Sequence, residues 1–150
     1  MNFIFISPQF PHTYWNFCNR LKKNGVNVLA IGDSSYDSLS KELKESITEY
    51  YRVNNMEDYD QMYRAVAFFA FKYGRIDWLE SNNEYWLEQD AKLRTDFNIT
   101  TGVDNKGIKK YKSKYEMKKY YIKAGVAVAR IHRVSDLKKA KKFIDEIGGY

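Results

Sequence analysis

Short apolar runs alternate with longer amphipathic segments over the first two thirds of the chain. The short runs have the length and β-branched content of buried strands, whereas the longer segments carry apolar residues three and four positions apart, as helices do. The predicted strands are 3–6, 26–31, 47–53 and 76–79, and the predicted helices are 14–24, 35–45, 56–73 and 84–97. This alternation indicates crossover units, and therefore an α/β domain with an open parallel sheet.

Several predicted helix ends carry the residue types that favour them. Thr13 is a candidate N-cap for helix 14–24, because a hydroxyl can accept a hydrogen bond from a free backbone N–H. Gly25 follows that helix and Gly74 follows helix 56–73, where glycine commonly ends a helix.

The organisation changes at the turn-rich segment 98–105, where we place a domain boundary between residues 104 and 105. The pattern then predicts a basic helix over 106–123, a strand over 126–134, and a helix over 136–147 that Ser135 caps and Gly148 and Gly149 end. A strand and a helix without a partner strand cannot bury their apolar sides. We therefore expect residues 105–150 to be an incomplete domain.

The charge is divided unevenly between these two parts. The net charge of the chain is +6, but residues 1–100 carry 11 Lys and Arg against 14 Asp and Glu, whereas residues 101–150 carry 14 against 5. Lysines and tyrosines interleave over 106–123, a composition typical of a phosphate or nucleic-acid site, although a solvated helix face explains most of these lysines. The aromatic residues, 17% of the chain, are spread along it and indicate a packed core rather than a base-stacking platform.

Several other classes of site and location are disfavoured. Cys18 is the only cysteine, so no internal disulfide can form, and its position in helix 14–24 favours a small buried residue over a nucleophile. His12 and His132 lack metal-ligand spacing, and we expect no metal site in this chain. No apolar run has the length of a membrane span and the start does not resemble a signal peptide, so we expect a cytoplasmic protein.

The loops that follow the strands are the candidate functional segments. In open parallel sheets ligands bind beyond the carboxyl ends of the strands, which points to loops 7–13, 32–35 and 80–84. The first loop lacks the glycines of a dinucleotide site, and no P-loop occurs anywhere in the sequence. Asp33, at a strand end, could bind a hydroxyl or a cation, but we favour the interpretation that it caps the turn that follows it. Glu80, at a strand end, is a better functional candidate than Glu84 and Glu88, which fit a solvated helix face.

Segments from both parts of the chain resemble the ATP-grasp ligases. Residues 114–130 are similar to the opening of the ATP-grasp domain, where a lysine begins a helix that ends in Ala-Gly-Val, and residues 143–150 are similar to a stretch further along that domain. Residues 79–84 resemble the loop after the fourth strand in biotin carboxylase and carbamoyl-phosphate synthase. The strand–helix units of 1–97 match the pre-ATP-grasp domain that precedes the ligase core.

This resemblance implies a Rossmann-like pre-ATP-grasp domain over 1–104 and the beginning of a nucleotide-binding ATP-grasp domain over 105–150. Lys114 takes the place of the first nucleotide-binding lysine, near the phosphates of ATP. Loops 7–13 and 80–84 would form one wall of the substrate cleft; their candidate residues are Ser7, Gln9, Glu80, Asn82 and Asn83.

The resemblance also implies a reaction. The parent enzyme would use ATP and Mg²⁺ to convert a carboxylate to an acyl phosphate, which an amine or another nucleophile then attacks. The family's second lysine, glycine-rich loop and magnesium ligands have no counterpart in residues 1–150, so we expect this fragment to be inactive without the remainder of the ATP-grasp domain. Ala127 and Ala129 also stand where the family often has proline.

Two other classes of function fit parts of the sequence. The first is a stand-alone α/β module that binds a small ligand or regulates a partner, without catalysis. The second is a nucleic-acid-binding domain that uses the basic segment, which the acidic first part and the lack of a recognised nucleic-acid fold disfavour.

Overall fold

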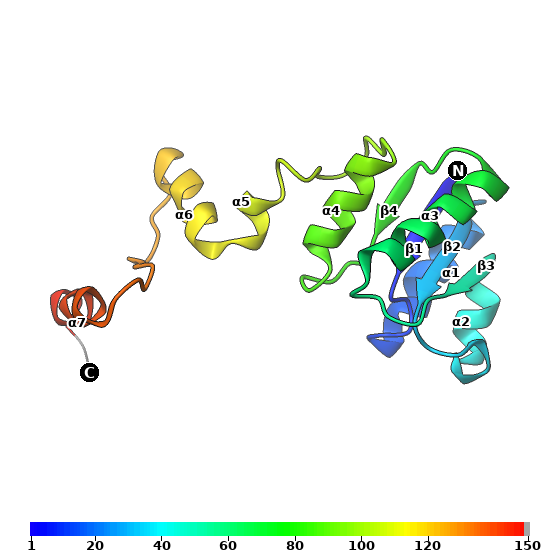
Figure 1. The fold of residues 1–150 in the computed structure, drawn as a ribbon, viewed down its shortest axis with the longest axis horizontal. Helices are drawn as coiled ribbons and strands as arrows, with labels where there is room; N and C mark the ends of the chain where they lie inside the picture. The colour runs from blue at the N-terminus through cyan, green and yellow to red at the C-terminus, as the bar shows by residue number, and fades with distance from the viewer. Residues whose placement is uncertain (149–150) are drawn as a thin grey trace. The chain divides into compact units, whose positions relative to one another are not determined.

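A computed structural model describes residues 1–148 and divides the chain into two compact units, 1–108 and the part that begins at Lys109 (Figure 1). The division lies four residues after the boundary predicted from the sequence. Among the described residues, no helix is long and apolar enough to cross a membrane.

The first unit is built on a four-stranded sheet in which every pairing is parallel. Its strands are β1 (Asn2–Ile6), β2 (Asn27–Gly32), β3 (Glu49–Arg52) and β4 (Trp78–Glu80), in the spatial order β3-β2-β1-β4. Ile4 pairs with Leu29 on one side and with Leu79 on the other, so β1 lies at the centre. The predicted α/β fold with an open parallel sheet is confirmed.

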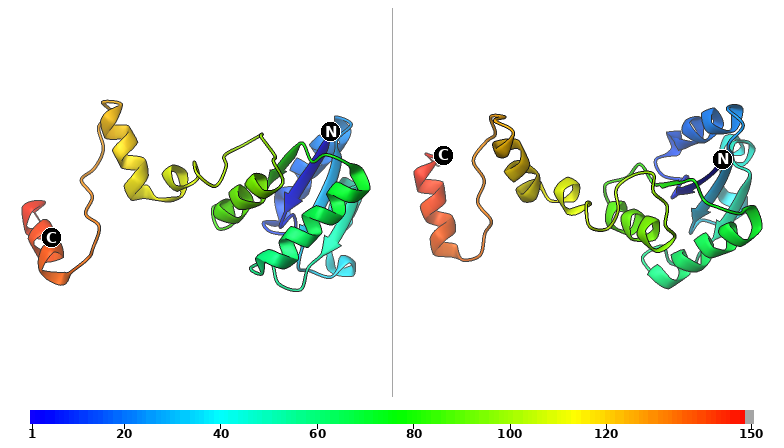
Figure 2. Two further views of the ribbon diagram at one scale, coloured as in Figure 1. Left: turned by 45° about the horizontal axis from the view of Figure 1, so that its top comes forward. Right: turned by 90° about the horizontal axis from the view of Figure 1, so that it is seen from above.

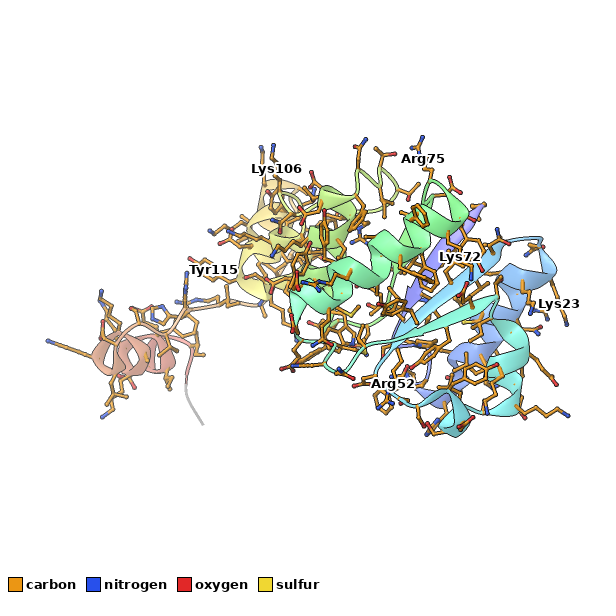
Figure 3. The ribbon with its side chains drawn as sticks, turned by 45° about the vertical axis from the view of Figure 1, so that its right-hand side comes forward. Lys23, Arg52, Lys72, Arg75, Lys106 and Tyr115 are labelled. Carbon is orange, nitrogen blue, oxygen red and sulfur yellow. The ribbon has the colours of Figure 1, made fainter. Side chains whose placement is uncertain are left out.

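Helices cover both faces of the sheet (Figure 2). Helices α1 (Trp15–Lys23) and α2 (Lys41–Ser46) pack on the face that carries Phe3, Phe5 and Val28, with Cys18 buried between them. Helix α3 (Tyr59–Tyr73) and helix α4 (Leu87–Asp96) belong to the opposite face, whose core includes Ile4, Leu29 and Leu79. Basic side chains such as Lys23 and Arg75 lie on the outside of this unit (Figure 3).

Several helices start at residues other than those predicted from the sequence. Thr13 does not cap α1, because a 3₁₀ turn, η1 (His12–Tyr14), precedes that helix and the side chain of Thr13 makes no cap bond. The predicted helix 35–45 is divided into a 3₁₀ turn, η2 (Tyr36–Ser38), and α2, because the Ser40 hydroxyl accepts from the Leu43 N–H and starts a new helix. Helix α3 starts at Tyr59 because Asp58 accepts from two backbone N–H groups.

The second unit contains α5 (Lys109–Lys112), α6 (Lys114–Lys123) and α7 (Leu137–Glu146). The predicted single helix over 106–123 was wrong: Ser113 caps α6 by accepting from the Glu116 N–H and separates it from α5. Asp136, rather than the predicted Ser135, caps α7. The prediction that Gly149 helps to end this helix concerns a residue outside those described, and so does the part of the resemblance that includes Tyr150.

The predicted strand over 126–134 was also wrong, since these residues pair with no other strand within the described part of the chain. A strand needs a neighbour to satisfy its N–H and C=O groups, and the second unit provides none. Moreover, no side chain between residues 109 and 148 is buried, and apolar residues such as Ile122, Val134 and Leu137 are exposed. This unit therefore has no hydrophobic core of its own.

Truncating a core residue of α3 should destabilise the first unit strongly. Phe69 is 0% exposed, and Phe69→Ala should lower the free energy of unfolding by roughly 3–5 kcal/mol through lost burial and a residual cavity. Phe71→Ala is the matched control on the same helix, because Phe71 is 93% exposed and its loss should change stability by less than about 0.5 kcal/mol. Urea unfolding followed by circular dichroism measures both; equal effects would contradict the assignment of the core.

Candidate functional site

The loops after β1 and β4 meet at one edge of the sheet. Because β1 pairs with β2 and β4 in parallel, all three strands end at the same edge. The crossover through α1 and the crossover through α3 cover opposite faces of the sheet. The chain adds β2 and β3 on one side of β1 and then places β4 on the other side, so the strand order reverses between β1 and β4. Such a switch point opens a crevice beyond the strand ends, and this is where ligands bind in open α/β sheets.

Two residues at this edge adopt a left-handed backbone conformation that is uncommon outside glycine. Ser7 directly follows β1 with a φ of 56°, and Asn82 lies two residues after β4 with a φ of 54°. The N–H of Ser7 donates to the carbonyl of Ile31 at 2.8 Å, which ties the start of its loop to the neighbouring strand. Residues held in such conformations cluster at functional sites.

A hydrogen bond links the 80–84 loop to Tyr14, the residue that follows loop 7–13. The hydroxyl of Tyr14 donates to the carbonyl of Asn82. The side chain of Asn83 instead bonds within its own loop. Its Oδ1 accepts from the Tyr85 N–H at 2.9 Å, in the turn that leads into α4. The structure therefore brings Asn82 against Tyr14 and gives Asn83 a local bond within its own turn.

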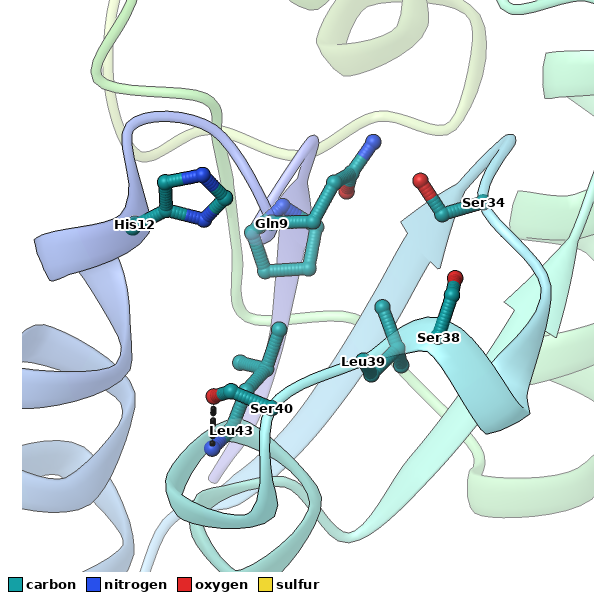
Figure 4. A pocket seen from close by; sticks show the side chains of 8 residues that line it. Gln9, His12, Ser34, Ser38, Leu39, Ser40 and Leu43 are labelled. Atoms are coloured by element: carbon teal, nitrogen blue, oxygen red, sulfur yellow. Dashed lines mark hydrogen bonds between the residues drawn. The ribbon is translucent and has the colours of Figure 1, made fainter.

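Gln9 lies further toward β2, in a different neighbourhood from Asn82. Its Nε2 donates to the Asp33 carboxylate at 3.0 Å, and its Oε1 is buried against Gly32, where a Cβ would lie only 2.7 Å from that oxygen. The interpretation of Asp33 as a cap was wrong, since its carboxylate accepts from Gln9 and no side chain caps the 3₁₀ turn that follows. A pocket of about 110 Å³ lies beside Gln9 (Figure 4). Its other lining residues are Pro8, His12, Ser34, Ser38, Leu39, Ser40 and Leu43.

Glu80 holds the 80–84 loop in shape through both of its carboxylate oxygens. Oε1 accepts from the backbone N–H of Ser81 at 3.2 Å and of Asn82 at 3.4 Å, and Oε2 accepts from Arg94 at 3.3 Å. The Glu80 side chain keeps 22% of its surface exposed. It can therefore contact a ligand while it orders the loop.

Behind this loop lies a buried polar network that the sequence patterns did not reveal. Asp90 and Arg94 of α4 are 0% and 2% exposed. Asp90 Oδ2 accepts from the Ser81 hydroxyl at 2.6 Å and from the Ser81 N–H at 3.1 Å. Arg94 donates to the Leu79 carbonyl and, through Nε, to the Val103 carbonyl, each at 2.8 Å.

The pKa of Asp90 is raised to about 7, chiefly by burial and in addition by the negative charge of Glu80. The hydrogen bonds from Ser81 and the positive charge of Arg94 act in the opposite direction. The Arg94 guanidinium is therefore paired with Glu80, whereas the Asp90 carboxylate is held by Ser81. Perturbed pKa values of this kind are enriched at functional sites, although structural networks produce them as well.

An apolar groove of about 340 Å³ borders the same edge on the α1 side. Its apolar lining comes from the first strand, from α1 and from β4, and its polar end is formed by Glu80 and Asn82. The apolar residues are Met1, Phe3, Phe17, Leu21 and Trp78. The groove thus joins an apolar surface to the predicted substrate loop.

Lys114 lies in the second unit, at the first position of α6, and its side chain is exposed. A cation is disfavoured at a helix N-terminus, because the free N–H groups there carry partial positive charge. The same N–H groups and an ammonium group together favour a bound anion such as a phosphate. Helix stability therefore does not explain a lysine at this position.

Within residues 1–148 no group of three or more His, Cys, Asp and Glu side chains could hold a metal ion. These described residues do not fit a magnesium site. Cys18 is fully buried, and burial raises the pKa of its thiol to about 12, so it has the properties of a core residue rather than of a nucleophile.

No protein-family model matches the sequence, and no curated protein sequence matches it. Solved structures do resemble it. The biotin carboxylase domain of the Hydrogenobacter thermophilus 2-oxoglutarate carboxylase, solved with MgADP, ADP and bicarbonate, matches with a TM-score of 0.71 at 20% identity, over 99% of this chain and 33% of that chain. An L-amino acid ligase from Bacillus licheniformis matches with a TM-score of 0.63 at 12% identity, over 99% of this chain and 42% of that one.

A third structure, the biotin carboxylase subunit of pyruvate carboxylase, matches with a TM-score of 0.62 at 22% identity over 99% of this chain. The chain spans 33–42% of the length of these three neighbours. At such low identities the likeness establishes the fold alone. The predicted fold of the first part, that of the N-terminal domain of biotin carboxylase, is confirmed.

Removing the charge of Asp90 should stabilise the protein at high pH. Because the pKa of Asp90 is about 7 in the folded protein and its ordinary value is 3.8, the neutral form favours folding, and this contribution is lost as the pH rises through 7. The stability advantage of Asp90→Asn over the parent chain should therefore grow by roughly 2–3 kcal/mol between about pH 5 and pH 8.

Denaturant unfolding at several pH values measures this difference. Glu88→Gln is the control, because Glu88 is an exposed carboxylate on the same helix. An advantage of Asp90→Asn that does not depend on pH would show that Asp90 is ionised in the folded protein throughout this range, as it is in the unfolded chain.

Proposed function

We propose that this chain is the N-terminal part of an ATP-grasp ligase, which activates a carboxylate as an acyl phosphate for attack by an amine or another nucleophile. The observation that carries the proposal is the extent of the structural likeness. It runs through 99% of the chain, across both units, in biotin carboxylases and in an amino acid ligase. A stand-alone domain of the first unit would not require the likeness to continue past Ile108.

In this proposal residues 1–104 are the pre-ATP-grasp domain and residues 105–150 begin the ATP-grasp domain. The remainder of that domain would supply the groups that bind Mg²⁺. It would also cover the apolar residues that the second unit exposes, of which Ile122 and Leu137 are examples. A neighbour of this fold was solved with MgADP, which is consistent with ATP and Mg²⁺ as the cofactors of the complete enzyme.

Two regions of this chain would take part in the reaction. Lys114, with the N-terminus of α6, would neutralise phosphate charge on the nucleotide. The crevice between β1 and β4 would form one wall of the substrate cleft through Ser7, Glu80 and Asn82, with Gln9 and Asn83 further along the same loops. These groups would orient the substrate, since precise positioning supplies a large part of phosphoryl-transfer catalysis.

The alternative is an α/β module that binds a small ligand without catalysis. The first unit supports it to some extent, because that unit has a complete core and two pockets at its functional edge. The second unit weighs against it, because a module without catalytic partners gains nothing from 40 residues that bury no side chain. We therefore prefer the ligase.

Lys114→Ala should weaken nucleotide binding in a protein that carries this chain together with the rest of an ATP-grasp domain. A hydrogen bond between charged groups contributes about 1.5–3 kcal/mol, so the affinity for ATP should fall roughly ten- to a hundredfold. Isothermal titration calorimetry measures the change, with Lys123→Ala, an exposed lysine at the other end of α6, as the control. Equal affinities for the parent protein and Lys114→Ala would remove Lys114 from the site.

The 150-residue chain itself should bind ATP very weakly. It offers a single exposed candidate lysine and, within the described residues, no metal-holding group, so we expect a dissociation constant above about 1 mM. Titration of MgATP into the isotopically labelled chain, followed by NMR, measures this. Micromolar binding that Lys114→Ala leaves intact would mean that the nucleotide binds elsewhere.

A further inference from the structure

We propose that the apolar groove beside β4 binds an apolar primary amine, which is the nucleophilic substrate of the proposed ligase. The groove has a volume of about 340 Å³, at the lower end of the range of roughly 300–1,000 Å³ that small-molecule sites occupy. The role of this amine as a substrate rests on the proposed function. The preference of the groove for an amine rests on its own lining, which lies wholly within the first unit.

The register of the sheet places aromatic rings and a carboxylate on one face. Phe3 of β1 lies opposite Trp78 of β4, and the two rings are within 10° of parallel with their centroids 6.4 Å apart. Glu80 is two residues after Trp78 and projects from the same face, because side chains alternate along a strand. Leu79, between them, belongs to the core of the opposite face. The groove therefore runs from aromatic rings to an acidic end.

The groove lies at the edge of the sheet, on the face that α4 does not cover. β4 is an edge strand, and α4, the helix that follows it, packs on the opposite face. Helix α1 supplies one wall through Phe17 and Leu21, which are four residues apart and so lie on the same side of the helix. Phe17 is 37% exposed. A ligand with an apolar body would remove this surface from water, which favours its binding.

Among the described residues that line the groove, Glu80 alone has a charged side chain. A carboxylate offers about four lone-pair positions to hydrogen-bond donors. Glu80 uses three of them, for the N–H groups of Ser81 and Asn82 and for Arg94, so one position is left for a ligand. Arg94 offsets part of the charge of Glu80, but it is 2% exposed and a ligand cannot reach it.

An ammonium group fits this end of the groove better than a hydroxyl or a carboxylate does. It would donate to the remaining position of Glu80 and to the exposed side chain of Asn82, which lines the same end. A ligand carboxylate would meet the like charge of Glu80 without a cation in reach. A hydroxyl could donate to Glu80 but would gain no charge interaction. The affinity should therefore fall in the order amine, alcohol, carboxylate.

The test is an NMR titration of the ¹⁵N-labelled 150-residue chain with phenethylamine, phenethyl alcohol and hydrocinnamate, at neutral pH and constant ionic strength and without nucleotide. The three probes share a phenylethyl group and differ in the end group. Phenethylamine should bind with a dissociation constant on the order of 1 mM and shift the signals of Trp78, Glu80 and Asn82. The alcohol should bind roughly three- to fivefold more weakly, because a partly exposed ion pair contributes little more than this, and hydrocinnamate should bind more weakly still.

Two variants change the apolar wall and the polar end separately. Phe17→Ala should weaken the amine and the alcohol alike, by roughly three- to tenfold, because both lose the same apolar contact. Asn82→Asp adds a second carboxylate beside Glu80 and should strengthen the amine alone, by roughly three- to fivefold. Aspartate also tolerates the left-handed backbone at this position. Phe71→Ala is the control, because Phe71 is 93% exposed on α3, outside the groove, and its loss should change no affinity.

Several results would overturn the groove as an amine site. These are the absence of phenethylamine binding up to about 20 mM, equal or tighter binding of hydrocinnamate, and an amine affinity that Asn82→Asp does not raise. None of them would affect the structural likeness on which the ligase proposal depends. Conversely, a complete protein that binds the amine in this groove but forms no product from it with ATP would contradict the proposed function and leave the preference of the groove for amines intact.

Discussion

The parallel pairing of β1 with a neighbour on each side determines which loops of this molecule lie together. It brings the ends of β1, β2 and β4 to one edge, and the crossovers on opposite faces place the switch point of the sheet between β1 and β4. The hydrogen bond from Tyr14 to Asn82 lies at that switch point and joins residues that are 68 positions apart in the sequence. Every residue that we assign to the substrate side depends on this arrangement.

Arg94 makes the arrangement rigid at the β4 side. Its guanidinium donates to carbonyls on both Leu79 and Val103, so it ties the last strand to the segment that leads out of the first unit. Gly102, with a φ of 85°, lets the chain turn there, and a Cβ at that position would lie only 3.2 Å from the Arg94 side chain. A buried cation is costly unless its donors are satisfied, and here the backbone and Glu80 satisfy them.

The sequence predicted the elements better than their ends. Apolar runs and helical spacing identified all four strands and the helices of the first unit, because those patterns follow directly from which residues must be buried. Helix starts were displaced wherever a single side chain offered a better cap than the predicted one, as Ser40, Asp58 and Ser113 do. Such bonds depend on one rotamer and leave no periodic signal.

The sequence analysis identified candidate residues in the loops of the site, but not the buried charged residues behind them. Glu80 was found because it ends a strand, but Asp90 and Arg94 were not distinguished from the charged residues around them. Their position in the helix contained a signal: Asp90, Leu93, Arg94 and Phe97 are spaced three and four apart, which places both charges on the face that carries the apolar residues. Two opposite charges at that spacing on a buried face indicate an internal ion network, whereas Glu84 and Glu88 remain exposed.

Among its described residues, the second unit has a backbone segment that joins no sheet and apolar side chains that stay exposed. Residues 126–134 have no strand to pair with among the described residues, and α7 carries Ile144 and Leu137 exposed at 50% and 70%. Short helices owe most of their stability to the burial of an apolar face, so these elements gain little from one another. Lys114 fits the same interpretation, because a cation at the start of α6 weakens the helix slightly and a nucleotide phosphate would reverse that effect. The exposed apolar side chains and the charge of Lys114 are therefore both unfavourable in this unit by itself.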